Sequence, residues 1–251
     1  MKIHFTGSAK PAARHAVQQL IDRYGQNDLA NAAYVVAIGG DGTALNALRS
    51  VMAKPGTAAF AMRLPGSVGA LANVLRLPDL PDRLRSAKPV TLRPLKAEIE
   101  RLNGEVTAAF GFNEIVVSRM RLQLAKLIVR VGDTDHFQKI AGDGLMVATP
   151  IGSKGYNRSA GGSTLQLDCG ALLLTGIAVR APSDWANAVL SDGVVIEIEV
   201  VDPSFHPVRV ETNFQEVLEI SRLKISLSLQ HTALLLLEPQ LADAKIKTAS
   251  I

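Results

Sequence analysis

The feature that most constrains the fold is a short, uninterrupted apolar run, Tyr-Val-Val-Ala-Ile, at residues 34–38. A strand that is apolar on both faces must be covered on both faces, as in a parallel sheet flanked by helices. Gly39-Gly40-Asp41-Gly42 ends this run, and residues 43–51 then place apolar side chains at helical spacing. The sequence therefore predicts a strand, a glycine loop and a helix of an open α/β domain.

The rest of the chain falls into two regions of different pattern. In the first region we expect strands at residues 2–5 and 58–62 and helices at residues 11–24 and 78–87. From about residue 91 the pattern becomes β-rich, beginning with a hairpin at Asn103-Gly104, a pair that favours the positive φ of a tight turn. Its strands are residues 97–101 and 106–110, and further strands are expected at residues 115–118, 125–131, 194–201 and 208–212.

These patterns predict an α/β N-terminal domain, with an open, Rossmann-like parallel sheet, and a β-rich C-terminal domain. The N-terminal domain is expected to comprise residues 1–90, rejoined by residues 233–251 through the apolar stretch 233–237. Residues 91–232 are expected to form the β-rich domain.

The composition excludes several classes of protein. The 251 residues, 47% of them hydrophobic, can bury a core without cross-links, and one cysteine, Cys169, allows no internal disulfide. The net charge of +4 and the aromatic content of 4% favour a small anionic ligand over nucleic acid. No apolar run approaches the roughly 20 residues of a membrane span, and the first residues do not form a secretory signal. We expect a cytoplasmic protein without a nucleic-acid or membrane partner and, because its five histidines are scattered, without a resident metal site.

The glycine loop at residues 39–43 is the first candidate site. In open α/β sheets ligands bind where a strand ends and a helix begins, and glycines let a phosphate approach the N–H groups of the helix start. Asp41 would repel a phosphate, so we expect it to accept a proton from a hydroxyl group or to hold Mg²⁺. The alternative is a tight turn in which Asp41 only caps the helix. The spacing matches neither the Rossmann nor the Walker pattern.

Two further segments are candidates with open alternatives. Residues 65–69 form either a second phosphate-facing loop or a simple turn. Asn113-Glu114 lies within an apolar stretch, where a buried polar group without a partner costs about 1–3 kcal/mol. These two side chains therefore need hydrogen-bond partners. Either they bind a ligand, such as a ribose or an adenine edge, or they form a turn at a strand edge.

The densest polar segment comprises Gly142-Asp143-Gly144 and residues 149–162. We expect residues 153–162 to form a functional loop, because a plain loop of this length is uncommon. The ring of Tyr156 can stack on a base. Lys154 and Arg158 either contact a ligand or are solvated cations.

Taken together, these motifs resemble the NAD kinase family. The family's ordered set is Gly-Gly-Asp-Gly after a strand, then Asn-Glu, then Gly-Asp-Gly followed by Thr-Pro-x-Gly-Ser-x-x-Tyr-Asn-x-Ser-Ala. The first motif is shared with phosphofructokinases and with diacylglycerol and sphingosine kinases, whereas the last is much more specific. The resemblance extends from residue 2 to about residue 237.

The resemblance implies ATP-dependent phosphorylation of the adenosine ribose 2′-hydroxyl of NAD, giving NADP, and it implies that residues 91–232 form the dinucleotide-binding domain. It implies that Asp41 is the proton acceptor, that Asn113 and Glu114 meet the adenosine, and that Asp143 meets a ribose or the nicotinamide end. The other implied binding residues are Gly39, Gly40, Gly42, Thr43, Lys154, Gly155, Tyr156, Asn157, Arg158, Ser159, Ala178 and Asn213. Mg²⁺ would bridge the ATP phosphates, and the family commonly forms homodimers or homotetramers.

Several residues depart from the family pattern around the implied dinucleotide pocket. The departures are Leu64-Pro65 for Asn, Ala70 for an aromatic residue, Ala141 for Arg, Lys154 for Thr, Gly155 for Ala, Asn213 for an acidic residue and Phe214 for His. Two alternatives therefore accompany the main expectation: a kinase acting on a lipid or another small alcohol, and a non-catalytic NAD(P)-binding homologue.

Overall fold

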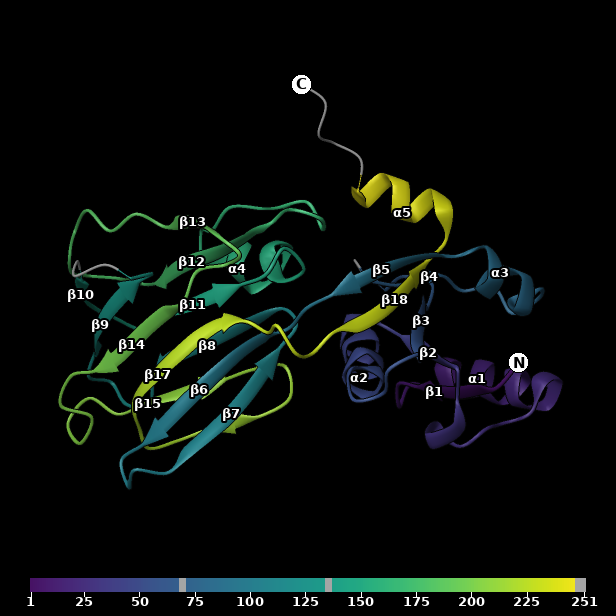
Figure 1. Cartoon of the computed structure of the whole chain (residues 1–251), viewed down its shortest axis with the longest axis horizontal. Coiled ribbons are helices and arrows are strands. Elements are labelled where there is room, and N and C mark those ends of the chain that lie inside the picture. The colour runs from purple at the N-terminus through teal and green to yellow at the C-terminus, as the bar shows by residue number, and fades with distance from the viewer. Residues whose placement is uncertain (68–70, 134–136, 247–251) are drawn as a thin grey trace. The chain divides into compact units, whose positions relative to one another are not determined.

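The chain divides into two compact units. The computed structural model describes residues 1–67, 71–133 and 137–246 (Figure 1). The first unit comprises Met1–Arg93 and Gln230–Ile251, and the second comprises Pro94–Leu229. Among the described residues, no helix is long and apolar enough to cross a membrane.

The first unit is built on a six-stranded sheet. Its strands are β1 (Ile3–Gly7), β2 (Tyr34–Gly39), β3 (Ala58–Arg63), β4 (Asn73–Val74), β5 (Lys88–Leu92) and β18 (Ala233–Leu237). The order is β1-β2-β3-β18-β5, with β4 also paired to β3, and all pairs are parallel except β18 with β5. The predicted parallel sheet is confirmed, with one antiparallel edge strand. This strand is antiparallel because the chain leaves the unit along β5 and returns along its neighbour β18 (Figure 1).

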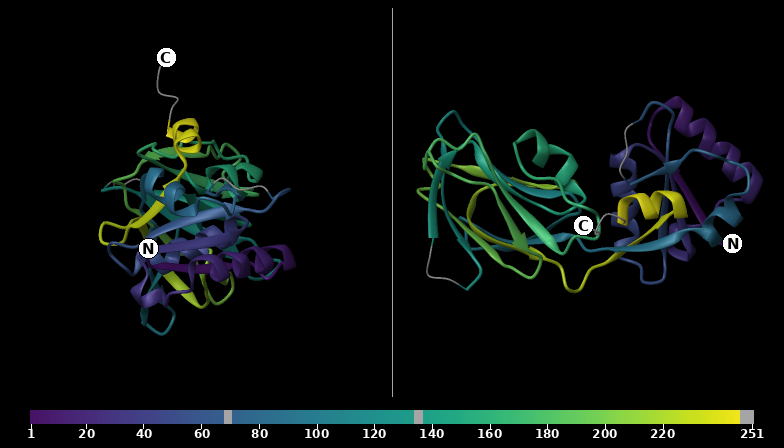
Figure 2. Two further views of the ribbon diagram at one scale, coloured as in Figure 1. Left: turned by 90° about the vertical axis from the view of Figure 1, so that its right-hand side faces the viewer. Right: turned by 90° about the horizontal axis from the view of Figure 1, so that it is seen from above.

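Helices pack against this sheet (Figure 2). They are α1 (Pro11–Tyr24), α2 (Asp41–Met52), α3 (Leu80–Ser86) and α5 (Pro239–Ile246), with a 3₁₀ turn η1 (Leu29–Asn31). Helix α1 has the predicted bounds and begins with proline, which suits the first helical turn. Helix α3 is shorter than predicted, because Asp79 has a left-handed backbone (φ 57°) and the helix begins at Leu80.

The second unit is a sandwich of two six-stranded antiparallel sheets, as its β-rich pattern predicts. One sheet has the order β10-β9-β14-β17-β6-β7, and the other β13-β12-β11-β8-β15-β16. The strands of the first are β6 (Leu95–Arg101), β7 (Val106–Gly111), β9 (Ala125–Val131), β10 (Phe137–Gly142), β14 (Ile196–Val200) and β17 (Ile220–Leu227). The strands of the second are β8 (Glu114–Arg119), β11 (Gly144–Ala148), β12 (Ala171–Ile177), β13 (Ala188–Ser191), β15 (Val208–Glu211) and β16 (Glu216–Val217). Alternate side chains of both sheets form one buried core.

Two local predictions in this unit have different outcomes. The Asn103-Gly104 turn joins β6 to β7, and Gly104 has the expected positive φ of 83°. The expected loop at residues 153–162 instead contains a 3₁₀ turn, η2 (Gly152–Lys154), and a short helix, α4 (Tyr156–Ser159). Buried side chains stabilise these turns: Ser153 Oγ donates to the carbonyl of Pro150 at 2.7 Å, and Asn157 makes the contacts described below.

Candidate functional site

The glycine loop lies at the junction of β2 and α2, as predicted. A Cβ added to Gly39 would lie 2.2 Å from Thr43 Oγ1, so the close packing of α2 on β2 requires glycine at this position. At Gly40 and Gly42, an added Cβ meets no described atom within 4 Å. Packing therefore does not account for glycine at these two positions, and their backbone is open to a ligand.

Asp41 is the first residue of α2, and Gly40 occupies the N-cap. The interpretation that Asp41 is only the helix cap is therefore wrong. Its Oδ1 accepts a hydrogen bond from the backbone N–H of Leu71 at 3.2 Å, so a segment beyond β3 helps to orient this carboxylate. Of the second glycine loop predicted at residues 65–69, residues 68 and 69 lie outside the described residues, as does Ala70.

Asn113 and Glu114 lie at the start of β8, in the second unit. Asn113 Oδ1 and Glu114 Oε2 are buried and have no hydrogen-bond partner among the described residues. Burial raises the pKa of the Glu114 carboxyl from 4.5 to about 7, because the charged form loses its hydration. Two unsatisfied oxygen acceptors side by side in the sequence are costly for the fold alone, and a ligand with hydroxyl donors would satisfy them.

Glu114 opens into a pocket of about 290 Å³ over one face of the second sheet. The pocket is lined by Glu114, Val116, Ser118, Tyr156, Arg209, Glu211, Thr212 and Asn213. Asn213 Oδ1 accepts a hydrogen bond from the backbone N–H of Asn113 at 3.1 Å, so this residue helps to fix the Asn-Glu pair. Sequence reasoning missed Ser118 and Arg209, although the alternation of β8 places Ser118 on the same face as Glu114.

Asp143 lies beside this pocket, on a turn whose two glycines are required by close packing. A Cβ on Gly142 would lie 2.8 Å from Val179 Cα, and one on Gly144 would lie 2.0 Å from the carbonyl oxygen of Val117. Gly144 also has a φ of 153°. Arg119 Nε donates to Asp143 Oδ1 at 2.6 Å, a partner that the sequence motifs did not indicate.

A second pocket, of about 480 Å³, is lined by Asp143 and Arg119. It shares Ser118, Tyr156 and Arg209 with the pocket at Glu114. The structure therefore brings together Glu114, Tyr156, Asp143 and Asn213 along one face of this sheet.

Tyr156 and its neighbours on η2 and α4 differ in what they offer a ligand. Tyr156 is 45% exposed and lines both pockets. The other predicted binding residues of this segment, Lys154, Gly155, Arg158 and Ser159, are exposed to solvent. Ala178 is exposed on the turn after β12, with a φ of 45°.

Asn157 has a structural role, contrary to the prediction that it binds a ligand. Its side chain is fully buried. The amide Nδ2 donates to the carbonyls of Ser153 at 3.2 Å and Ser163 at 2.7 Å, and Oδ1 accepts from Thr175 Oγ1 at 2.7 Å. Because all these groups are engaged within the protein, the side chain fixes α4 against β12.

The described part of the chain contains no cluster of three or more His, Cys, Asp or Glu side chains that could hold a metal ion.

The fold, an open α/β unit joined to a β-sandwich, is similar to that of two solved kinases. The structure of yeast NADH kinase complexed with NADH has a TM-score of 0.82 at 16% identity, covering 100% of this chain and 89% of that chain. The NAD kinase from Archaeoglobus fulgidus in complex with ATP has a TM-score of 0.77 at 21% identity, covering 96% and 95%. These similarities establish the fold.

The sequence comparisons identify the family. Residues 112–234 match the ATP-NAD kinase C-terminal domain. The NAD kinase of Mesorhizobium japonicum is 35% identical over 94% of this chain and 91% of that protein, and the NAD kinase of Xanthomonas oryzae is 36% identical over 95% and 93%. The chain belongs to the NAD kinase family, as its motifs indicated.

Proposed function

We propose that this protein transfers the γ-phosphoryl group of ATP to the adenosine ribose 2′-hydroxyl of NAD, giving NADP. The observation that carries the proposal is the near-full-length similarity to NAD kinases together with an intact glycine loop, in which Asp41 opens α2. None of the departures from the family pattern falls within this loop.

Asp41 would act on the acceptor hydroxyl. A carboxylate oxygen within hydrogen-bond distance of the 2′-hydroxyl can accept its proton as the oxygen attacks the γ-phosphorus and the bond to the β-bridging oxygen of ATP breaks. The open backbone at Gly40 and Gly42 would let a phosphate approach the N–H groups at the start of α2. Orientation by the Leu71 N–H supports this role, because a fixed carboxylate lowers the entropic part of the barrier.

Residues of the second unit would bind the adenosine part of NAD. The buried acceptors Asn113 Oδ1 and Glu114 Oε2 suit the vicinal hydroxyls of a ribose, which are hydrogen-bond donors. The aromatic side chain of Tyr156, an exposed residue, offers a stacking surface for adenine. Asp143, held by Arg119, offers an acceptor for a second ribose hydroxyl.

Magnesium would be part of the nucleotide substrate. As the resemblance to NAD kinases implies, Mg²⁺ would bind the ATP phosphates, where it offsets their charge. We also propose a cytoplasmic homodimer or homotetramer, since the family commonly forms these. Light scattering coupled to size-exclusion chromatography tests the oligomeric state.

The experiment that tests the function is product identification. Purified protein is incubated with NAD, ATP and Mg²⁺, and NADP is measured with a coupled dehydrogenase and its phosphate position by NMR. Parallel reactions replace ATP by polyphosphate, or NAD by NADH or by a lipid alcohol. NADP phosphorylated at the 2′ oxygen supports the proposal. Phosphorylation of only the lipid alcohol, or NAD binding without turnover, would replace it with one of the two alternatives.

A further inference from the structure

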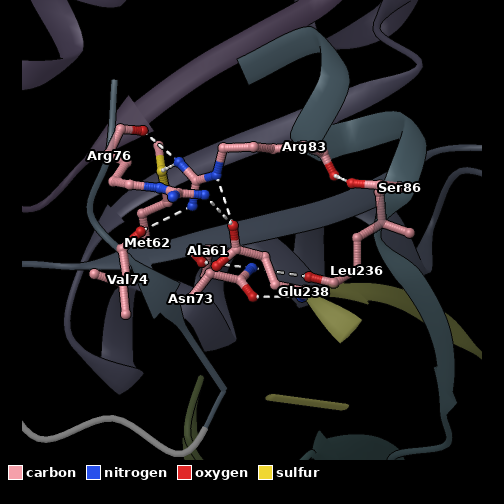
Figure 3. Close-up of polar contacts among 9 residues, drawn as sticks. All are labelled: Ala61, Met62, Asn73, Val74, Arg76, Arg83, Ser86, Leu236 and Glu238. Carbon is pink, nitrogen blue, oxygen red and sulfur yellow. Dashed lines mark hydrogen bonds and ion pairs between the residues drawn. The ribbon is translucent and has the colours of Figure 1, made fainter. Parts of the chain in front are cut away.

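Asn73 lies at a fork in the sheet of the first unit. Strand β3 pairs with β18 near its start, at Ala58 and Ala59, and with β4 near its end, at Met62 and Arg63. Where β18 diverges and β4 begins, backbone groups lose their strand partners. The buried side chain of Asn73 fills this place (Figure 3).

The amide of Asn73 satisfies three of these backbone groups. Nδ2 donates to the carbonyls of Ala61 at 3.2 Å and Leu236 at 3.0 Å, and Oδ1 accepts from the N–H of Glu238 at 2.8 Å. One side chain therefore ties β4 both to β3 and to the end of β18.

Arg83, on α3, holds the chain that follows β4 (Figure 3). The residue is only 5% exposed, and its guanidinium donates to the carbonyl of Val74 at 2.9 Å and to the carbonyl of Arg76. Its Nε forms an ion pair with Glu238 Oε1 at 2.8 Å. The guanidinium carbon also lies 5.3 Å from the centroid of the Phe60 ring. A buried arginine with this many partners fixes the backbone it contacts.

This clamp, formed by Asn73 and Arg83, acts on the segment that orients Asp41. Leu71, whose N–H donates to Asp41 Oδ1, lies two residues before Asn73 and is itself buried. Displacement of β4 from β3 would therefore move the Leu71 N–H, and with it the carboxylate.

We propose that Asn73 and Arg83 are positioning residues for phosphoryl transfer, which set the orientation of Asp41 through the backbone N–H of Leu71. The inference rests on the proposed role of Asp41. Neither side chain needs to contact a substrate, so their loss is expected to affect turnover rather than substrate binding.

The test compares Arg83→Met with Arg76→Met in the full chain. Arg76 pairs with the same Glu238 carboxylate at 3.1 Å, but its side chain is 64% exposed, so it is a matched control outside the clamp. For Arg83→Met we expect kcat per folded molecule to fall about 10- to 100-fold, as a misplaced catalytic group does. The KM values for NAD and ATP are expected to stay within about 2-fold, because ground-state contacts are unchanged. Arg76→Met is expected to keep wild-type kcat. If Arg83→Met folds poorly, Arg83→Lys, which keeps a cation, is expected to show the same split to a smaller degree. Asn73→Ser, which removes the amide without burying a charge, is expected to show the same split.

A double-mutant cycle separates positioning from general destabilisation. Arg83→Met and Arg83→Lys are combined with Asp41→Asn, and residual turnover is measured with radiolabelled ATP. A residue that acts through Asp41 has no further effect once the carboxylate is gone, so the double variants are expected to match Asp41→Asn. An equal loss of kcat in both backgrounds, or a loss no greater than that of Arg76→Met, overturns the clamp's role. Wild-type turnover in Asp41→Asn alone would instead refute the proposed function of Asp41.

Discussion

The buried carboxyl of Glu114 predicts a pH-dependent stability that a single substitution removes. Its pKa is about 7 in the folded chain and close to 4.5 when the chain is unfolded, because only the folded state desolvates it. The folded state therefore binds a proton more tightly. The contribution of this proton to the free energy of unfolding is fully present below pH 4.5 and is lost as the pH rises through about 7. Because the pKa is raised from 4.5 to about 7, the free energy of unfolding falls by roughly 3 kcal/mol as the pH rises across this range.

Urea unfolding of the ligand-free chain measures this loss. The single tryptophan, Trp185, packs against the core of the unit that contains Glu114, so its fluorescence reports the right transition. Between pH 4.5 and 8, the free energy of unfolding of Glu114→Gln is expected to rise relative to wild type by about 3 kcal/mol. Glu105→Gln changes a 57% exposed carboxylate in the same unit and is the control, with a difference from wild type that stays nearly constant. Parallel pH profiles for wild type and Glu114→Gln would refute the assigned burial and pKa.

Three further predictions follow from individual contacts. Arg83→Met should lower the free energy of unfolding by about 3 kcal/mol, because it removes the buried donor to two carbonyls and leaves the Glu238 carboxylate with only the exposed Arg76. Arg76→Met, at an exposed pair, should cost less than about 1 kcal/mol by chemical denaturation. Gly144→Ala should lower the free energy of unfolding of the second unit by at least about 1 kcal/mol. Gly144 has a φ of 153°, and a Cβ at this position would lie 2.0 Å from the carbonyl oxygen of Val117. An unchanged thermal midpoint would contradict this prediction. Glu114→Gln should raise the KM for NAD about 10-fold at pH 8, because a neutral amide replaces an ionised carboxylate that accepts a hydrogen bond from a ribose hydroxyl. An unchanged KM in steady-state kinetics would count against this contact with the ribose.

Local patterns were sufficient to predict much of the fold. The apolar run of β2, the glycine loop and the start of α2 are adjacent in the sequence, so composition and spacing alone define them. The Asn103-Gly104 hairpin follows from the same kind of local rule. The polar pair Asn113-Glu114 was marked by its apolar surroundings, and in the structure two of its oxygens are buried without partners.

The remaining features depend on contacts between distant residues. Nothing near Asp41 in the sequence indicates that Leu71 donates to it, and Arg83 meets Glu238 across 155 positions. The sequence also does not indicate whether a polar side chain points toward solvent. Asn157 has exposed neighbours in its motif, yet its amide is buried and hydrogen-bonded to two backbone carbonyls and one hydroxyl group. Such assignments need the packed structure, because sequence spacing does not specify which face of a short helix is buried.

The central claim is that the Asp41 carboxylate accepts the proton of the NAD 2′-hydroxyl, and the turnover of Asp41→Asn tests it most directly. With ATP and Mg²⁺ saturating, the account predicts that kcat for NADP formation falls by at least about 100-fold. NAD affinity, measured by calorimetry, should stay near the wild-type value, and Asp22→Asn, an exposed substitution on α1, should leave both quantities unchanged. Near-normal turnover in a correctly folded Asp41→Asn variant would contradict the account.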